Sequence, residues 1–186
     1  MKNTSPISLA FDQIIFMIYE INLIVNRHWG RWITCWFGGS AGVIVSYRLD
    51  RFGFLLFKNG WRAIRVLFFP LFLFLRLLSY AHEIHYAADI GKGLKILHPS
   101  LGVVVNGNLI AGDHLTLTGG NCLGQRKKMS YGEFKIGSHV SLGANAVILG
   151  PVIVGDHVRV GAGAVVIETA PDNATLVGVP AKAKPS

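Results

Sequence analysis

The stretch GLKILHPSLG, residues 93–102, places one histidine, His98, between an aliphatic run and a Pro-Ser turn signal. An imidazole exchanges protons near neutral pH, so a histidine that reaches the surface at a turn is a candidate general base. A lone histidine beside an apolar run is also commonly a structural core residue. The stretch alone leaves both interpretations open, and the elements that position it decide between them.

Cysteine usage and charge exclude several other classes of site. The two cysteines, Cys35 and Cys122, form no disulfide framework and neither has metal-ligand spacing, which fits a reducing cytosol. The net charge is +8, but the basic residues are not interleaved with aromatic ones as in a nucleic-acid-binding module. We therefore expect no metal and no nucleic-acid partner.

A six-residue repeat organises the second half of the chain. Counting in sixes from residue 136 finds an aliphatic residue at every step: Ile136, Leu142, Ile148, Val154, Val160 and Val166. Upstream, Ile84, Ile90 and Ile96 fit the same count, which resumes at Val104 and Ile110 and again, after a further slip, at Leu117 and Leu123. Hexapeptide repetition indicates a parallel β-helix, in which aliphatic side chains stack inward from coil to coil.

One segment interrupts this repeat. GQRKKMSYGEFK, residues 124–135, is too polar and too long to be a corner between strands. It is expected to loop out from the coil wall and to carry Arg126, Lys127, Lys128, Tyr131 and Glu133. Such a charge run is often only a solvated surface, but long excursions from a rigid scaffold also tend to be functional.

The first eighty residues are both apolar and basic, with nine Lys/Arg against three Asp/Glu. Residues 7–25 have the spacing of an amphipathic helix, and three tryptophans, Trp29, Trp32 and Trp36, alternate with arginines after it. The run VLFFPLFLFL, residues 66–75, is half the length of a spanning helix and contains Pro70. We expect residues 1–80 to lie on a membrane surface; packing of these faces on one another, or true insertion, are the alternatives.

Two stretches of the repeat region resemble a known family. EIHYAADIGKGLKILHPSLGVVV and KIGSHVSLGANAVILGPVIVGDHVRVGAGAVV are similar to the serine acetyltransferase branch of the hexapeptide acyltransferases, and LVGVPAKAK resembles the family's closing motif. The resemblance covers about residues 83–184. It implies a left-handed β-helix, a homotrimer with sites between subunits, and acetyl-CoA as the donor.

The same resemblance assigns roles to individual residues. The family's catalytic histidine falls on His98, and its supporting acid, fifteen residues earlier and usually aspartate, falls on Glu83. A carboxylate that accepts one imidazole N–H leaves the other nitrogen free to act as a base on the acceptor hydroxyl. The family's donor-binding positions fall on Gly124 and Ala144. Beyond the resemblance, Gly143, Ala162 and Gly163 have the same small character, and Lys182 is available for a CoA phosphate.

Two departures from serine acetyltransferases bear on the acceptor. Their second functional histidine is matched here by Glu133, which with Tyr131 is our candidate for acceptor binding. Their acidic helical domain is replaced by the basic, apolar residues 1–80. This arrangement looks like relatives in capsule, exopolysaccharide and O-antigen pathways, so a sugar hydroxyl is favoured as acceptor over L-serine.

We therefore predict a mainly β protein with an α-helical N-terminal region at residues 1–80 and a left-handed β-helix acetyltransferase domain at residues 81–186, acting in the cytoplasm at the inner face of the membrane. Serine O-acetylation is the main alternative. A non-catalytic trimeric scaffold is another. A zinc enzyme using His98, His114 and His139 is the third, although these histidines lack the expected close spacing.

Overall fold

The computed structural model describes residues 5–25, 39–78 and 82–184. The chain divides into two compact units, residues 1–80 and residues 81–186, and each unit is described by itself below. Cys35 and the three tryptophans predicted to lie at a membrane interface fall outside the described residues.

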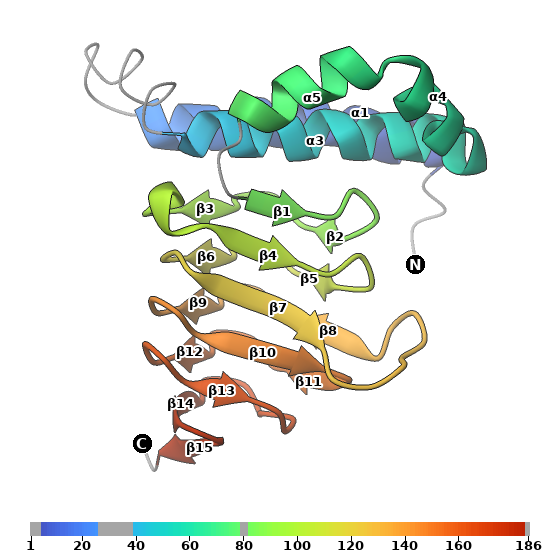
Figure 1. Ribbon diagram of the computed structural model, residues 1–186. Coiled ribbons are helices and arrows are strands. Elements are labelled where there is room, and N and C mark those ends of the chain that lie inside the picture. Colours follow the sequence, from blue (N-terminus) through green and yellow to red (C-terminus); the bar gives the residue numbers. More distant parts are fainter. Residues whose placement is uncertain (1–4, 26–38, 79–81, 185–186) are drawn as a thin grey trace. The chain divides into compact units, whose positions relative to one another are not determined.

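The second unit is a left-handed β-helix whose short strands form three sheets (Figure 1). Sheet A contains β1 (His82–Ile84), β4 (Val103–Val105), β7 (Asn121–Gln125), β10 (Val147–Gly150) and β13 (Val165–Val166). Sheet B contains β2 (Asp89–Ile90), β5 (Ile110–Ala111), β8 (Phe134–Ile136) and β11 (Val152–Val154). Sheet C contains β3 (Lys95–Ile96), β6 (Thr116–Leu117), β9 (Ser141–Leu142), β12 (Arg159–Val160), β14 (Thr175–Gly178) and β15 (Ala181–Lys184). All neighbours pair in parallel except β14 and β15, which form an antiparallel hairpin at the C-terminal end.

The six-residue count predicts the core of this unit correctly from residue 136 onward. Every residue of that count, from Ile136 to Val166, is at most 3% exposed. The same holds upstream for Ile90, Leu117 and Leu123, whereas the assignment of Val104 and Ile110 to the core is wrong. Val104 is 44% exposed, and its neighbours Val103 and Val105 point inward instead.

A three-residue insertion explains that error. The inward positions run from Ile96 to Val105, a spacing of nine, which is one repeat plus three residues. The extra residues form the short 3-10 turn η2 (Pro99–Leu101) between β3 and β4. A corner with three additional residues bulges outward, and His98 immediately precedes it.

Side chains at the corner between sheets B and C cap the backbone of the preceding coil. Asp113 Oδ1 accepts the Lys92 N–H at 3.0 Å, and Asp156 Oδ1 accepts the Ser138 N–H at 2.6 Å. The other two corners are capped in the same way. Ser138 Oγ accepts the Asp113 N–H at 3.3 Å, and Asp172 Oδ1 accepts the Asp156 N–H at 2.8 Å. We call this series the corner ladder. Each coil is thus capped by a side chain from the next coil.

Three histidines stack along the same corner. The rings of His114 and His139, and those of His139 and His157, have centroids 4.8 Å apart in nearly parallel planes. All three have φ between 57° and 59°, the left-handed conformation that ends each corner.

The first unit contains α1 (Pro6–Val25), α3 (Ser40–Phe57), the 3-10 turn η1 (Lys58–Gly60), α4 (Trp61–Leu67) and α5 (Phe69–Leu78). Helices α1 and α3 pack together around a charged pair, because the fully buried Arg48 of α3 bonds both carboxylate oxygens of the buried Glu20 of α1. Arg48 also donates to Gln13 Oε1 at 2.8 Å. Pairing and hydrogen bonding are what make such burial of charge tolerable.

Helix α1 buries polar side chains and exposes apolar ones. Gln13 and Glu20 are at most 4% exposed, whereas Phe11, Ile15 and Ile18 are each more than 50% exposed. Within the described residues, α1 is the one helix long and apolar enough to span a membrane, a test that the core helix of a soluble protein or a signal sequence can also pass. The helix is therefore amphipathic, as expected, and much of its apolar stripe is exposed. The stripe still meets α3 at both ends, where Phe11 lies edge-on to Phe52 with centroids 5.9 Å apart and Val25 packs against Ala41.

Candidate active site

His98 lies at the surface of the corner between sheets C and A. Its backbone N–H donates to Thr118 O at 2.8 Å, and its carbonyl accepts the Leu101 N–H at 3.2 Å, which closes η2. The side chain is exposed and makes no hydrogen bond within the described part of the chain. The backbone is thus fixed on both sides while the imidazole remains accessible, which excludes the interpretation of a buried core histidine.

The next coil supports His98 through a glycine turn. An ideal Cβ on Gly119 would lie 2.5 Å from the His98 carbonyl oxygen, so only glycine allows the two coils to approach this closely. The Gly119 N–H donates to Oδ1 of Asn121 at 2.9 Å. Asn121 is 1% exposed, and its Nδ2 donates to Gly143 O at 2.8 Å and Ala146 O at 3.3 Å. It therefore clamps the corners of two successive coils together.

Asn121 is not among the residues predicted from the sequence. The one available signal was its polarity at the first position of β7, where an inward side chain is expected to be apolar. A buried amide of this kind must be hydrogen-bonded, and here its bonds shape the turn behind His98.

Glu83 lies in β1 of sheet A, and its exposed side chain points away from the coil interior. Its register partner is Val104 of β4, the strand that follows the His98 corner. Glu83 and His98 therefore belong to the same coil and flank the same edge of sheet A. Their side chains form no hydrogen bond or ion pair within the described residues.

Four of the predicted donor-binding residues stack on the corner that carries His98. Gly143 and Ala144 follow β9, and Ala162 and Gly163 follow β12, so both pairs lie between sheets C and A on later coils. Backbone bonds join these corners, with the Asn145 N–H donating to Gly119 O at 2.9 Å and the Gly163 N–H to Ala144 O at 2.9 Å. The structure thus aligns His98 and the small residues along one edge of the solenoid.

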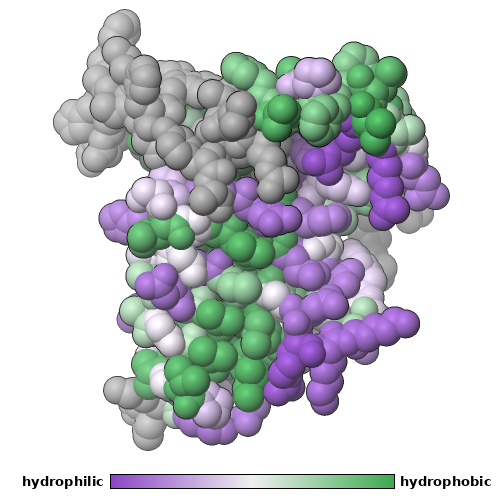
Figure 2. Space-filling model, in the orientation of Figure 1, coloured by the Kyte–Doolittle hydropathy of each residue, from purple (hydrophilic) through white to green (hydrophobic). Residues whose placement is uncertain are grey.

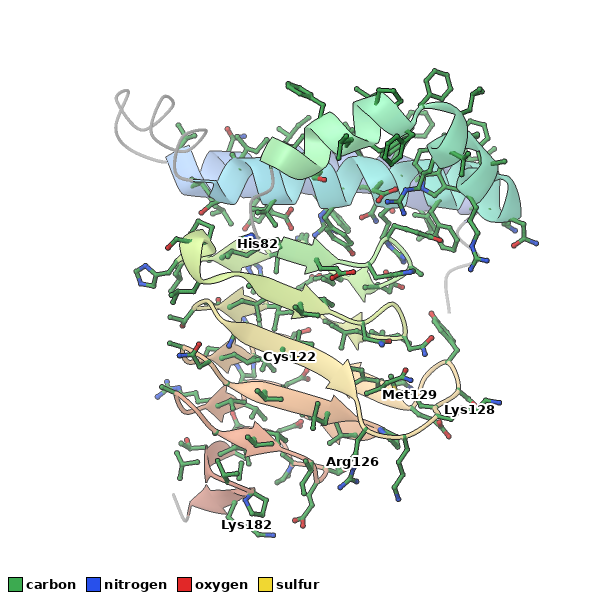
Figure 3. The ribbon with its side chains drawn as sticks, in the orientation of Figure 1. His82, Cys122, Arg126, Lys128, Met129 and Lys182 are labelled. Carbon is green, nitrogen blue, oxygen red and sulfur yellow. The ribbon has the colours of Figure 1, made fainter. Side chains whose placement is uncertain are left out.

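The two remaining donor candidates lie elsewhere. Gly124 is in β7 of sheet A, paired with Leu149, and a Cβ there would make only ordinary contacts of 3.4 Å. Lys182 is in the C-terminal hairpin, where its Nζ forms an exposed ion pair with Glu168 at 2.9 Å. Figure 3 shows Lys182 well separated in the view from Arg126 and Lys128 on the loop after β7.

The excursion predicted at residues 124–135 is shorter in the structure. Gly124 and Gln125 continue β7, and the buried Phe134 begins β8, so the loop comprises residues 126–133. Glu133 Oε2 accepts the Ser130 N–H at 2.6 Å, and the Glu133 N–H donates to Ser130 O at 3.3 Å. Glu133 therefore closes its own loop, while Tyr131 is 73% exposed at the loop's surface.

The loop and His98 lie at opposite edges of sheet A. The loop leaves the end of β7, whereas His98 precedes the start of β4. The five residues of β7 separate these edges by about 16 Å at 3.3 Å per residue. A single chain therefore does not bring Tyr131 and Glu133 next to His98.

The structure gives no support to a metal centre built from the predicted histidines. His114 and His139 stack at the corner between sheets B and C, whereas His98 lies at the corner between sheets C and A. Within residues 5–25, 39–78 and 82–184, no three His, Cys, Asp or Glu side chains converge as ligands.

Comparison with known protein families and sequences gives three findings. Residues 135–168 match the family model described as bacterial transferase hexapeptide (six repeats). The chain is 37% identical over 150 residues to the "Putative colanic acid biosynthesis acetyltransferase WcaB" of Escherichia coli K12, covering 76% of this chain and 88% of that protein. It is also 44% identical over 105 residues to chloroplastic serine acetyltransferase 1 of Arabidopsis thaliana, covering 56% of this chain and 33% of that protein.

Solved structures give a consistent result over nearly the whole chain. A serine acetyltransferase in complex with CoA matches with a TM-score of 0.69 and 26% identity, covering 95% of this chain and 73% of that one. The serine acetyltransferase of Neisseria gonorrhoeae matches with a TM-score of 0.72 and 26% identity, covering 94% of this chain and 66% of that one.

Proposed function

Because the chain belongs to the bacterial hexapeptide transferase family and is an acetyltransferase, we propose that His98 is its general base and that it transfers acetyl from acetyl-CoA to a hydroxyl of a saccharide. The observation that carries this proposal is the placement of His98. Its backbone is fixed by two hydrogen bonds, its imidazole is exposed, and small-residue corners continue along the same edge.

In the proposed reaction an imidazole nitrogen of His98 takes the proton of the acceptor hydroxyl as its oxygen attacks the thioester carbonyl carbon. The carbon–sulfur bond then breaks, and the CoA sulfur leaves and takes up the proton that His98 held. Glu83 flanks the same edge of sheet A and is proposed to accept the other imidazole N–H once substrates are bound. General base assistance of this kind contributes roughly 10² to 10⁴ in rate.

Donor binding is proposed for the edge that continues from His98. The CoA complex among the structural relatives supports acetyl-CoA as the donor. Ala162 and Gly163 are exposed, and no atom lies within 4 Å of an ideal Cβ on Gly163, which leaves open space beside that corner. Gly143 has a sufficient structural reason to be glycine, because a Cβ would lie 2.6 Å from the Ala162 nitrogen. Gly124 has no such reason, which favours close approach of a ligand there.

The separation of His98 from the loop favours a homotrimer in which a second copy supplies the loop. Outward residues of sheet A provide an apolar surface for such contact, since Val104 is 44% exposed and Val147 and Val165 are partly exposed. Figure 2 shows hydrophobic side chains gathered over the later strands of this sheet. Tyr131 and Glu133 of one copy would then border the acceptor site of another.

Two features favour a saccharide acceptor. A relative that is 37% identical over 76% of this chain is named for colanic acid biosynthesis, and colanic acid is a polysaccharide. Glu133 stands where serine acetyltransferases have a second functional histidine, and its carboxylate accepts the Ser130 N–H of its own loop. L-serine remains the second candidate, because the similar solved structures are serine acetyltransferases.

We further propose that the enzyme acts in the cytoplasm at the inner face of the membrane, with residues 1–80 on the lipid surface. The exposed apolar stripe of α1 supports this placement, because an apolar surface of this kind is stable against lipid or a partner and not against water. An acceptor carried on a lipid would be presented at that surface.

The catalytic proposal is tested with two histidine variants. His98→Ala should lower kcat by at least a hundred-fold while the melting temperature and oligomeric state stay unchanged. His157→Asn is the matched control, since it removes an exposed histidine from another corner and asparagine tolerates the same left-handed backbone. Unchanged kcat in His98→Ala would refute the assignment of His98 as the base.

The acceptor is tested by following consumption of acetyl-CoA with L-serine and with a panel of nucleotide-linked and lipid-linked sugars. Faster turnover with one or more sugars is the expected result. Turnover with L-serine alone would establish the second candidate, and no turnover with either class, together with no binding to immobilised CoA, would support the scaffold alternative.

A further inference from the structure

Helices α4 and α5 enclose a hollow on the helical unit that combines an apolar wall with two arginines. It is lined by Arg62, Arg65, Val66, Phe69, Phe72 and Leu73. Figure 2 shows hydrophobic side chains along these helices with hydrophilic ones adjoining them. The predicted reaction takes place on the other unit of the chain and uses none of these residues.

Fixed side chains hold the two helices that line the hollow. Trp61 is 7% exposed and donates its indole N–H to Asp50 Oδ1 at 2.7 Å. Its ring occupies the space beside Gly53 of α3, where a Cβ would lie 2.1 Å from the indole. Phe72 meets the same indole edge-on, with ring centroids 5.5 Å apart. These contacts lock α4 and α5 onto α3.

One arginine is positioned by this arrangement and the other is free. The Arg65 guanidinium lies 3.7 Å from Asp50 Oδ2 and 5.4 Å from the centroid of the Phe72 ring. Arg62 is exposed and has no hydrogen bond or ion pair to any described residue. Lys58, one turn earlier, is also exposed, and no acidic residue occurs between residues 58 and 78.

Apolar side chains extend from the hollow to the surface around it. Val66 and Leu67 are 76% and 75% exposed, and Phe69 and Phe74 are 60% and 57% exposed. A soluble anion would use the arginines but not this apolar surface, and an apolar peptide would leave Arg62 without a counter-charge. The combination is complementary to an anion that is attached to hydrocarbon chains.

We propose that this hollow binds the phosphate head group of an anionic phospholipid, with Arg62 as the main contact and the exposed residues of α4 and α5 against the acyl chains. The proposal rests on the membrane contact proposed above for residues 1–80 and is independent of the acceptor. A second copy of the chain is a poorer occupant, because residues 1–80 carry nine basic against three acidic residues and two such surfaces repel each other.

The test is vesicle flotation of the full-length chain. Wild type should float with vesicles of phosphatidylglycerol and phosphatidylcholine, and less with phosphatidylcholine alone. Arg62→Glu changes the local charge by two units and should lower partition onto the anionic vesicles about thirty-fold. Arg159→Glu, which reverses an exposed arginine of β12, is the matched control and should float like wild type.

A second pair of variants tests the apolar half of the site. Phe69→Ser should weaken binding to anionic vesicles several-fold, whereas Ile153→Ser, at a 49% exposed position of β11, should not. Far-UV circular dichroism checks that each variant retains its helices, and sedimentation without vesicles reports self-association. Loss of self-association in Phe69→Ser with unchanged flotation would assign the surface to a second copy and overturn the proposal.

Two further outcomes separate this proposal from its alternatives. Flotation that requires a polyprenyl phosphate in the phosphatidylcholine vesicles, and does not occur with phosphatidylglycerol, would assign the hollow to a lipid carrier and overturn the phospholipid proposal. Equal losses of flotation in Arg62→Glu and Arg159→Glu would show that net charge alone attracts the chain to the vesicles, and would overturn the proposal. Because His98→Ala should float like wild type, failure of the catalytic proposal leaves this test intact.

Discussion

Replacing Asn121 by alanine tests whether the buried amide behind His98 supports the site. In the wild type its side chain makes three hydrogen bonds, to Gly119, Gly143 and Ala146. The two carbonyls keep other partners in the variant, since Gly143 O also accepts the Ala146 N–H and Ala146 O accepts the Cys122 N–H. The Gly119 N–H loses the acceptor that Asn121 provides.

The expected loss of stability follows from this difference. A buried donor left without an acceptor costs about 1 to 3 kcal/mol, and the two weakened carbonyl contacts add about 0.5 kcal/mol each. We therefore expect Asn121→Ala to lower the free energy of unfolding by about 3 kcal/mol. Gly119 contacts the His98 carbonyl, so relaxation of the turn displaces the base, and kcat should fall roughly ten- to a hundred-fold.

Urea denaturation at one fixed protein concentration measures the first quantity, because unfolding of an oligomer depends on concentration. Steady-state kinetics measures the second. Asn145→Gly is the control, since Asn145 is exposed, lies in the next corner and has φ of 58°, which glycine adopts readily. Equal stability of the Asn121 variant and this control would refute the clamp, and a stability loss with unchanged kcat would separate the clamp from catalysis.

Three further predictions concern other contacts. Gly119→Ala should reduce kcat and the yield of folded protein together, because its Cβ would lie 2.5 Å from His98 O, and normal kinetics would contradict this. Glu20→Gln should lower the thermal stability of the helical unit by about 3 kcal/mol, as it leaves buried Arg48 without a counter-charge; circular dichroism in the presence of vesicles measures it. Lys182→Ala should change unfolding by less than about 1 kcal/mol, since its ion pair is exposed, and a raised KM for acetyl-CoA would support its role at the donor.

The sequence was sufficient to predict the solenoid, because its core is periodic. Inward positions repeat every six residues wherever the corners have constant length, and the count from Ile136 to Val166 is uninterrupted. Where a corner is longer, the count alone does not say how many residues were added. The turn Pro99–Leu101 adds three residues, and this is why Val104 was assigned to the wrong face.

The site was predictable in part, for physical reasons that differ between residues. The repeat places His98 and the small residues of later corners on the coil wall, where equivalent positions stack along one edge, whereas the role of His98 came from the resemblance to the family and stays a prediction. Asn121 was not predicted, because the amide's function depends on backbone groups from two other coils. Helical spacing likewise showed that α1 has an apolar stripe, but spacing does not say whether that stripe faces a neighbouring helix or the outside.

The corner ladder implies an order in which the coils of the β-helix are completed during synthesis. Asp113 caps the amide of Lys92, and Asp172 caps that of Asp156, so each coil receives its cap from residues that the ribosome adds about twenty positions later. A coil that has just been synthesised is therefore incomplete until its successor follows. Each coil should therefore acquire its caps only after the next coil has been synthesised. A chain that ends within a coil leaves the preceding coil without its cap. The hairpin of β14 and β15 ends the parallel stacking of coils with an antiparallel pair.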